Sequence, residues 1–192
     1  DDVISYHRME NELVSRTLKL VRDQGFRVIL EGRMNLYMDD EEFYDDRKNS
    51  REYAEKLHRE MGEHLLTIRD HYDEWEVSKM SCDTTDCDVA AIQDRLEEDF
   101  HLLIHNPSVM EMVPRGYSKG GGIAEVCRLL DIDISDTIAV GDSMNDLDML
   151  EAAGVSVAMG NGCDAAKVAA DMVTDALDED GIMNAMKRLG LI

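Results

Sequence analysis

The stretch that decides the fold is TIAVGDSMNDLDML, residues 137–150. Its first part, residues 137–140, is a short apolar run typical of a buried parallel strand. Apolar residues then recur at helical spacing, which places Asn145 and Asp146 in the first turn of a helix. Asp142 is therefore expected at the carboxyl end of the strand, where open α/β sheets bind their ligands. Two carboxylates and an amide in such a position suit a hard cation and a phosphate group.

A simpler interpretation of the same residues is open. An ordinary strand–loop–helix turn would use Asp142 as a helix N-cap and Asp146 as a carboxylate favoured by the helix dipole. A calcium loop is excluded, because its pattern requires an oxygen ligand where Met144 stands. The sequence upstream favours the site over the ordinary turn.

The upstream element is YSKGGGIAEVCRLL, residues 117–130. Its apolar spacing predicts an amphipathic helix with Ser118 as N-cap and Lys119 in the first turn, where the dipole favours an anion. Three glycines after Lys119 weaken the helix and are expected where the backbone approaches another group closely. A P-loop is excluded because its glycines precede its lysine, and a solvated surface lysine is the alternative. The buried face is expected to comprise Ile123, Val126, Cys127 and Leu130.

Together, Lys119, Asp142 and the Asn145–Asp146 pair resemble the C-terminal motifs of the haloacid dehalogenase (HAD) superfamily of phosphatases, specifically its Cof-type branch, subfamily IIB. The resemblance continues through VSVAMGNGCDAAKVAADMVTD, residues 155–175. It is specific from residue 114 onward and holds in outline before that. It implies a Mg²⁺-dependent phosphatase that hydrolyses a small phosphorylated metabolite through an aspartyl-phosphate.

The resemblance also implies a role for each residue of the motif. Asp142 would bind Mg²⁺, and Asp146 would support the metal through water or by holding Lys119. Lys119 would offset phosphoryl charge, and Asn145 would hydrogen-bond a phosphate oxygen. Lys119 and Asp142 are thus the expected catalytic residues, Lys119 and Asn145 the substrate-binding residues, and Asp142 and Asp146 the metal-binding residues.

The sequence departs from the family at its nucleophile. The DxDGT-like motif that carries the attacking Asp is not found: Asp131 and Asp133 follow a helix end, and Asp146 and Asp148 lie within a helix. We therefore expect the chain to be part of a longer phosphatase, inactive alone. The strand at 137–140 would then keep an apolar edge that another segment or a neighbouring chain covers.

Two other functions fit the same motifs. The chain could be a non-catalytic binding or interaction module of HAD descent. It could also belong to a phosphomutase, which shares the chemistry but passes the phosphoryl group to a second sugar.

The expected fold class is α/β, with two domains. Residues 1–113 alternate helices, strands and hairpins, as in an α+β cap with a mixed or antiparallel sheet, and residues 114–192 read as the C-terminal half of a HAD-like, doubly wound, Rossmann-like core. The strands expected in the first domain lie at 3–6, 26–30, 36–38, 77–81, 102–104 and 109–113. We also expect a helix at 11–24, a second helix starting at residue 50, and an apolar helical repeat at 65–75. The acidic stretch at 39–46 is expected to be a solvated loop or a frayed helix, in preference to a metal site. The second domain is expected to carry further strands at 155–158 and 172–174, a short helix from residue 164 and a helix at 178–189.

Composition limits the partners. A net charge of −22, from 42 acidic and 20 basic residues, repels nucleic acid and anionic membranes, so neither is an expected partner. No apolar run reaches the length of a membrane span, and no signal peptide is visible. The four cysteines form no CxxC pair, and we expect reduced thiols in a cytoplasmic protein.

Overall fold

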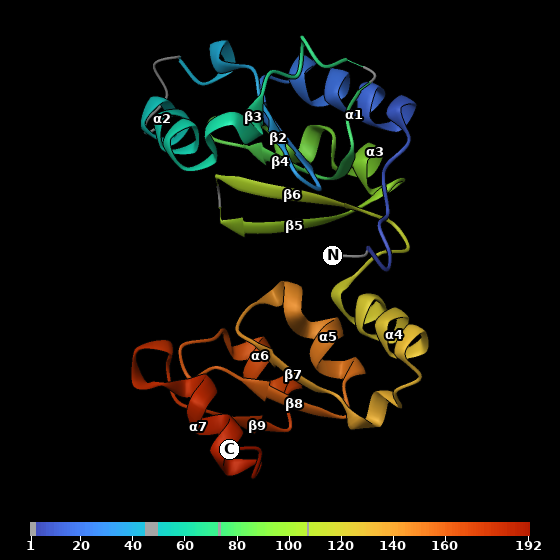
Figure 1. Cartoon of the computed structure of the whole chain (residues 1–192). Helices are drawn as coiled ribbons and strands as arrows, with labels where there is room; N and C mark the ends of the chain where they lie inside the picture. Colours follow the sequence, from blue (N-terminus) through green and yellow to red (C-terminus); the bar gives the residue numbers. More distant parts are fainter. Residues whose placement is uncertain (1–2, 45–49, 73, 107) are drawn as a thin grey trace. The chain divides into compact units, whose positions relative to one another are not determined.

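The computed structural model describes residues 3–44, 50–72, 74–106 and 108–192. The chain divides into two compact units, unit 1 at Asp1–Arg115 and unit 2 at Gly116–Ile192 (Figure 1). The division falls between residues 115 and 116, whereas the sequence pattern predicts it between residues 113 and 114. The difference arises because Pro114 still pairs with Phe100 in the sheet of unit 1.

Within its described residues, unit 1 contains a six-stranded sheet in the order β3-β2-β1-β4-β6-β5. Neighbouring strands run antiparallel except β2 and β3, which run parallel, so the sheet is mixed as expected. The strands are β1 Arg27–Gly32, β2 Leu36–Tyr37, β3 Leu65–Leu66, β4 Val77–Asp83, β5 Phe100–Asn106 and β6 Val109–Pro114. The helices are α1 Asn11–Asp23, α2 Ser50–Met61 and α3 Gln93–Glu97.

Apolar side chains pack on both faces of this sheet. Val28 and Leu30 of β1 face the main core, where Trp75 is the largest fully buried side chain. Ile29, between them, faces a smaller cluster formed with Phe43 and with residues of α2. A strand with period-two side chains can bury both faces only when a layer covers each one. The predicted strand near residues 26–30 is therefore confirmed as a central strand.

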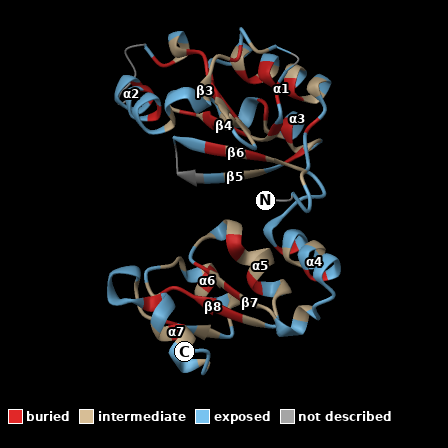
Figure 2. Ribbon diagram, in the orientation of Figure 1, coloured by how far each residue is buried: buried red, intermediate tan, exposed pale blue. Residues whose placement is uncertain are grey.

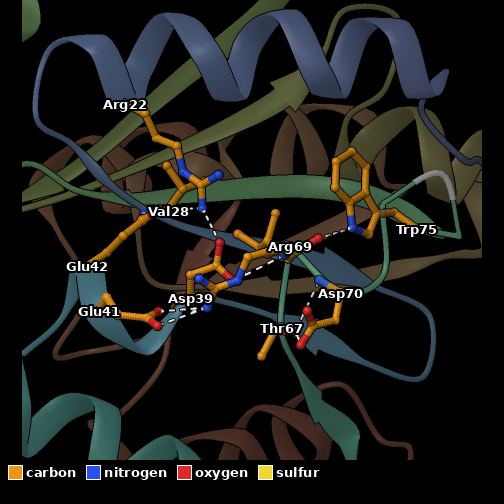
Figure 3. A network of polar contacts seen from close by, with 10 residues as sticks. Arg22, Val28, Asp39, Glu41, Glu42, Thr67, Arg69, Asp70 and Trp75 are labelled. Atoms are coloured by element: carbon orange, nitrogen blue, oxygen red, sulfur yellow. Dashed lines mark hydrogen bonds and ion pairs between the residues drawn. The ribbon is translucent and has the colours of Figure 1, made fainter.

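The acidic stretch at residues 39–46 contains a 3₁₀ turn at Asp40–Glu42, in keeping with the expected frayed helix, but Asp39 is buried. Figure 3 shows Arg22 of α1 reaching Asp39, with Nη2 2.9 Å from Oδ2, and Asp39 is only 8% exposed. Arg22 also pairs with Glu42, whose other oxygen accepts a hydrogen bond from the Val28 N–H at 3.2 Å. Burial raises the pKa of Glu42. The ion pairs with Arg22 thus explain why Asp39 is buried and Glu42 half-buried. The last two residues of the stretch lie outside the described residues.

Two segment predictions are wrong. Residues 3–6 form no strand, although the Met9 N–H donates to the Val77 carbonyl at 2.7 Å just beyond them. The described residues between 65 and 75 form β3 and turns instead of a helical repeat. The Trp75 indole N–H donates to the Ile68 carbonyl at 3.1 Å, so a buried tertiary hydrogen bond closes this segment on itself.

Unit 2 contains a parallel three-stranded sheet in the order β7-β8-β9 within its described residues. Its strands are β7 Ile138–Gly141, β8 Val155–Ala158 and β9 Met172–Val173, and its helices are α4 Lys119–Leu130, α5 Leu147–Ala152, α6 Asp164–Ala169 and α7 Gly181–Arg188. Strands alternate with helices, as in half of a doubly wound sheet. Among the described residues β7 pairs with β8 alone, so β7 is an edge strand.

The core of unit 2 is small. It is centred on Leu150 and on alanines of β7, β8 and α6, and Figure 2 shows long exposed stretches on α4 and α7. Only Gly120 and Cys127 of α4 are buried, whereas Val126 is 49% and Leu130 is 52% exposed. The expectation that Val126 and Leu130 lie on the buried face is therefore wrong. The reason is that α4 packs on α5 along a narrower stripe than the apolar sequence pattern implies.

A search of the described residues for membrane spans finds no helix that combines the necessary length and apolarity.

Candidate active site

The motif residues lie where β7 ends. The strand runs to Gly141 and is followed by Asp142, a single 3₁₀ turn at Met144–Asp146, and then α5. The strand–loop–helix expectation for residues 137–150 is confirmed, with a 3₁₀ turn as its first helical turn. The motif therefore lies at the carboxyl end of a parallel strand, the usual ligand-binding edge of an open α/β sheet.

Asp146 is the centre of the hydrogen bonding. Its Oδ1 accepts from Lys119 Nζ at 2.5 Å, and its Oδ2 accepts from the backbone N–H groups of Asp142 and Ser143 at 2.9 and 3.1 Å. The residue is 3% exposed. Burial alone would raise the pKa of this carboxyl, but the bonds from Lys119 and the two N–H groups outweigh burial and lower the pKa to about 2. Asp146 is therefore ionised at neutral pH.

Lys119 begins helix α4, where the Ser118 hydroxyl accepts a hydrogen bond from the Gly121 N–H at 3.1 Å. The predicted cap is confirmed. The Lys119 side chain is half exposed, so its ammonium contacts Asp146 on one side while water reaches the rest. The ion pair with Asp146 thus holds the Lys119 side chain at the surface of the site.

Gly141 permits the close approach of Asp146. A Cβ added at Gly141 would lie 2.6 Å from the Asp146 Cβ, which is closer than real contacts allow. Any side chain at this position would therefore push the carboxylate away from the Asp142 N–H. The close contact with Asp146 thus explains why a glycine, Gly141, precedes Asp142.

The loop after β8 also holds the motif, and the sequence interpretation did not anticipate this. The Met159 N–H donates to the Gly141 carbonyl at 2.9 Å, and the Cys163 N–H donates to the Asp142 carbonyl at 2.8 Å. The MGNG turn at residues 159–162 could have predicted this contact. It follows β8, and the carboxyl ends of parallel strands lie at the same edge of a sheet, so the turn lies beside the motif that follows β7.

The two remaining motif residues differ in their surroundings. The Asn145 amide oxygen accepts a hydrogen bond from the Ser143 hydroxyl, and Asn145 is half-buried. Asp142 is exposed. The structure thus brings Lys119 into contact with Asp146, and Asp146 into contact with the backbone of Asp142, while the Asp142 carboxylate faces solvent.

The donor set suits a cation such as Mg²⁺ that keeps several of its water ligands. Mg²⁺ prefers oxygen ligands and is commonly held by one or two carboxylates together with substrate phosphate. Asp142 offers an exposed carboxylate, whereas both oxygens of Asp146 already accept hydrogen bonds. No group of three or more His, Cys, Asp or Glu residues able to hold a metal is found in the described part of the chain. The residues therefore fit a site with few protein ligands.

Unit 2 has a parallel α/β sheet with a lysine–aspartate ion pair beside the carboxyl end of its edge strand, and an α+β unit precedes it in the chain. This combination is the HAD-like fold with a cap. The chain belongs to the haloacid dehalogenase-like hydrolase family, whose sequence profile matches residues 1–186.

Several similar proteins are phosphatases. The 5-amino-6-(5-phospho-D-ribitylamino)uracil phosphatase YcsE of Bacillus subtilis is 36% identical over 129 residues, which is 66% of this chain and 50% of that protein. Phosphatase YwpJ of the same organism is 44% identical over 92 residues, which is 48% of this chain and 32% of that protein. The matched parts thus cover half or less of these relatives.

Solved structures agree with this fold. The HAD subclass IIB sugar phosphatase BT4131 superposes with a TM-score of 0.75 at 25% identity, over 100% of this chain and 71% of that one. The phosphatase BT1666 from Bacteroides thetaiotaomicron superposes with a TM-score of 0.79 at 24% identity, over 100% of this chain and 69% of that one.

Proposed function

We propose that this chain is the cap and the C-terminal core half of a Mg²⁺-dependent phosphatase that hydrolyses a small phosphorylated metabolite through an aspartyl-phosphate. The observation that carries the proposal is the contact between Lys119 and Asp146, whose carboxylate also binds the backbone of Asp142. The Lys119 ammonium and the exposed residue Asp142 are thereby brought to the same edge of a parallel sheet. Phosphoryl transfer depends mainly on such positioning and on charge stabilisation.

Each residue of the site has a distinct task in this proposal. Asp142 holds Mg²⁺, which when bound neutralises phosphate charge and orients the phosphoryl group. Lys119 contributes a second positive charge, and Asn145 donates a hydrogen bond to a phosphate oxygen. Asp146 supports the metal site indirectly, because its two oxygens hold the Lys119 ammonium and the Asp142 N–H.

Unit 1 has a pocket suited to selecting the organic part of a ligand. The pocket has a volume of about 250 Å³, and its lining includes Phe43, Tyr53, Ser81 and Asp83. Aromatic rings beside hydroxyl and carboxylate oxygens suit a ligand with an apolar skeleton and hydrogen-bond donors. We therefore assign substrate selection to unit 1, in keeping with a cap.

The remainder of the core belongs to the same proposal. A preceding segment of a longer protein, or a neighbouring chain, supplies the nucleophilic Asp and covers the open edge of β7. The support is that matched relatives are at least twice as long as the part they share with this chain, and that apolar residues of α4 are exposed. We propose that the whole protein is located in the cytoplasm.

The test compares two proteins with p-nitrophenyl phosphate and Mg²⁺. The 192-residue chain is expected to release no nitrophenol above buffer, because the attacking Asp is absent. The longer protein that contains it is expected to turn over, with activity lost on chelation. Asp142→Asn in the longer protein should lower kcat/KM by at least about 100-fold. Clear Mg²⁺-dependent hydrolysis by the 192-residue chain would refute the fragment proposal.

A second measurement separates the proposal from its alternatives. Titration of the 192-residue chain with Mg²⁺ and phosphate should show weak binding, because half of the phosphate site is missing. Tight binding would favour a non-catalytic binding module. Transfer of phosphate to a second sugar rather than to water in the longer protein would favour a phosphomutase.

A further inference from the structure

Besides Asp146 of the 3₁₀ turn, a carboxylate of α5 contacts the start of α4. Asp148 lies two residues after Asp146, and its Oδ2 accepts a hydrogen bond from the Gly120 N–H at 2.9 Å. The side chain is half-buried. The first N–H groups of a helix have no partner within the helix, so a carboxylate from another helix satisfies one of them and interacts favourably with the helix dipole.

The backbones of the two helices touch at the same point. Gly120 is buried, and a Cβ added there would lie 2.5 Å from the backbone oxygen of Asp148. Only glycine allows the first turn of α4 to approach α5 this closely. The hydrogen bond and the packing are independent observations, and both fix the position of the residue that follows Lys119.

We propose that Asp148, together with Gly120, is a positioning residue that fixes the start of α4 so that the Lys119 ammonium reaches Asp146. The two carboxylates act on successive residues of α4: Asp146 accepts from the Lys119 side chain, and Asp148 accepts from the Gly120 backbone. The effect of this positioning on catalysis rests on the proposed function, whereas the positioning of Lys119 itself does not.

The physical reason is conformational freedom. A lysine side chain has four rotatable bonds and loses rotamer entropy when it is held in one geometry. If the helix start also moved, Lys119 would have to span a variable distance to Asp146. Anchoring the Gly120 N–H keeps that distance within the length of the side chain.

The test is competitive acetylation of the full chain with limiting acetic anhydride, followed by peptide mass spectrometry. Only the free amine reacts, so a lysine held against a carboxylate is labelled slowly. Asp148→Ala should raise the labelling rate of Lys119 by about three-fold or more relative to Lys167 and Lys187. Asp148→Asn should stay near the wild-type rate, because its amide oxygen still accepts from the Gly120 N–H.

Two further variants make the result specific. Asp133→Ala is the matched control, because Asp133 also caps a turn of unit 2, by accepting from the Ser135 N–H at 2.9 Å, and should leave Lys119 labelling unchanged. Gly120→Ala keeps Asp148 but separates the helices and should raise Lys119 labelling as Asp148→Ala does. Global unfolding of a variant would raise the labelling of Lys167 and Lys187 as well.

The outcomes separate the two proposals. An unchanged Lys119 rate in both folded variants, Asp148→Ala and Gly120→Ala, would overturn the positioning role whatever the protein catalyses. A raised Lys119 rate, restored by Asp148→Asn, supports the role even if the longer protein hydrolyses no phosphate ester. In a longer protein that is active, Asp148→Ala should lower kcat more than it changes KM.

Discussion

The two units bury apolar side chains to different extents. Unit 1 has large side chains at its centre, among them Trp75, Phe100 and Leu30, each no more than 1% exposed. Unit 2 is centred mainly on alanines, and it leaves Val168 86% and Leu177 71% exposed. The two units therefore differ in how much of their apolar side-chain surface they bury.

The polar site of unit 2 nevertheless contains a buried, hydrogen-bonded carboxylate. Asp146 is 3% exposed, and its hydrogen bonds to Lys119, Asp142 and Ser143 are complete within the unit. The comparison indicates that local hydrogen bonds can form the motif without a large core around it. Four measurements test this difference between the units, beginning with the largest expected effect.

The largest effect is expected in the main core of unit 1. Leu30→Ala removes a fully buried side chain and should lower the free energy of unfolding by about 3 kcal/mol. Urea denaturation followed by tryptophan fluorescence measures it, since Trp75 is the sole tryptophan of the sequence and lies in this core. Ile104→Ala, at a residue 53% exposed on β5, should change the value by less than about 1 kcal/mol. Equal losses for both variants would contradict the assigned core.

Leu150→Ala is the corresponding change in unit 2. We expect a loss of about 2 kcal/mol, at the lower end of the range for leucine, because small neighbours give the side chain fewer contacts. Hydrogen exchange of the amides of β7 and β8 measures it. The control is Leu177→Ala, which should leave the exchange rates of these amides nearly unchanged because Leu177 is exposed. A loss above that of Leu30→Ala would remove the contrast between the units.

Acid should weaken unit 2 through Asp146. The pKa of this carboxyl in the folded state is about 2, below its ordinary value of 3.8. Its ionised form therefore stabilises the fold fully above about pH 4, and this contribution is lost as the pH falls towards 2. We expect roughly 1 kcal/mol, because Lys119 is half exposed and water screens the pair.

The measurement is the difference in unfolding free energy between wild type and Asp146→Asn at pH 5, 3.5 and 2.5. That difference should shrink as the pH falls, and Lys119→Met should reduce its pH dependence. A constant difference across the three pH values would show that Asp146 is not preferentially ionised in the folded state.

The smallest effect on stability is expected on the outer face of α4. Val126→Ser combined with Leu130→Ser should change the free energy of unfolding by less than about 1 kcal/mol, because both side chains are about half exposed. Self-association of the chain should fall, as measured by sedimentation velocity at increasing concentration. A loss of more than 2 kcal/mol would show that this face is buried in the chain itself.

Local sequence patterns determined much of this protein. The apolar run before Asp142, the Ser118 cap and the helical spacing after Asn145 each depend on neighbours within a few residues. The strand and both helix starts could therefore be predicted. The contact of Lys119 with Asp146 joins residues 27 positions apart, and it was implied by the family resemblance and not by local spacing. The catalytic and metal-binding assignments of Lys119, Asp142, Asn145 and Asp146 stay predictions.

Contacts between distant residues were decided by tertiary structure alone. The burial of Asp39 depends on Arg22 in another helix, and the turn at residues 65–75 depends on the bond from Trp75 to Ile68. The bond between Asp148 and Gly120 joins residues 28 positions apart. Sequence spacing predicts which side chains share one face of a helix or strand. It does not predict what covers that face, because the free energy of burial depends on elements that only the folded chain brings together.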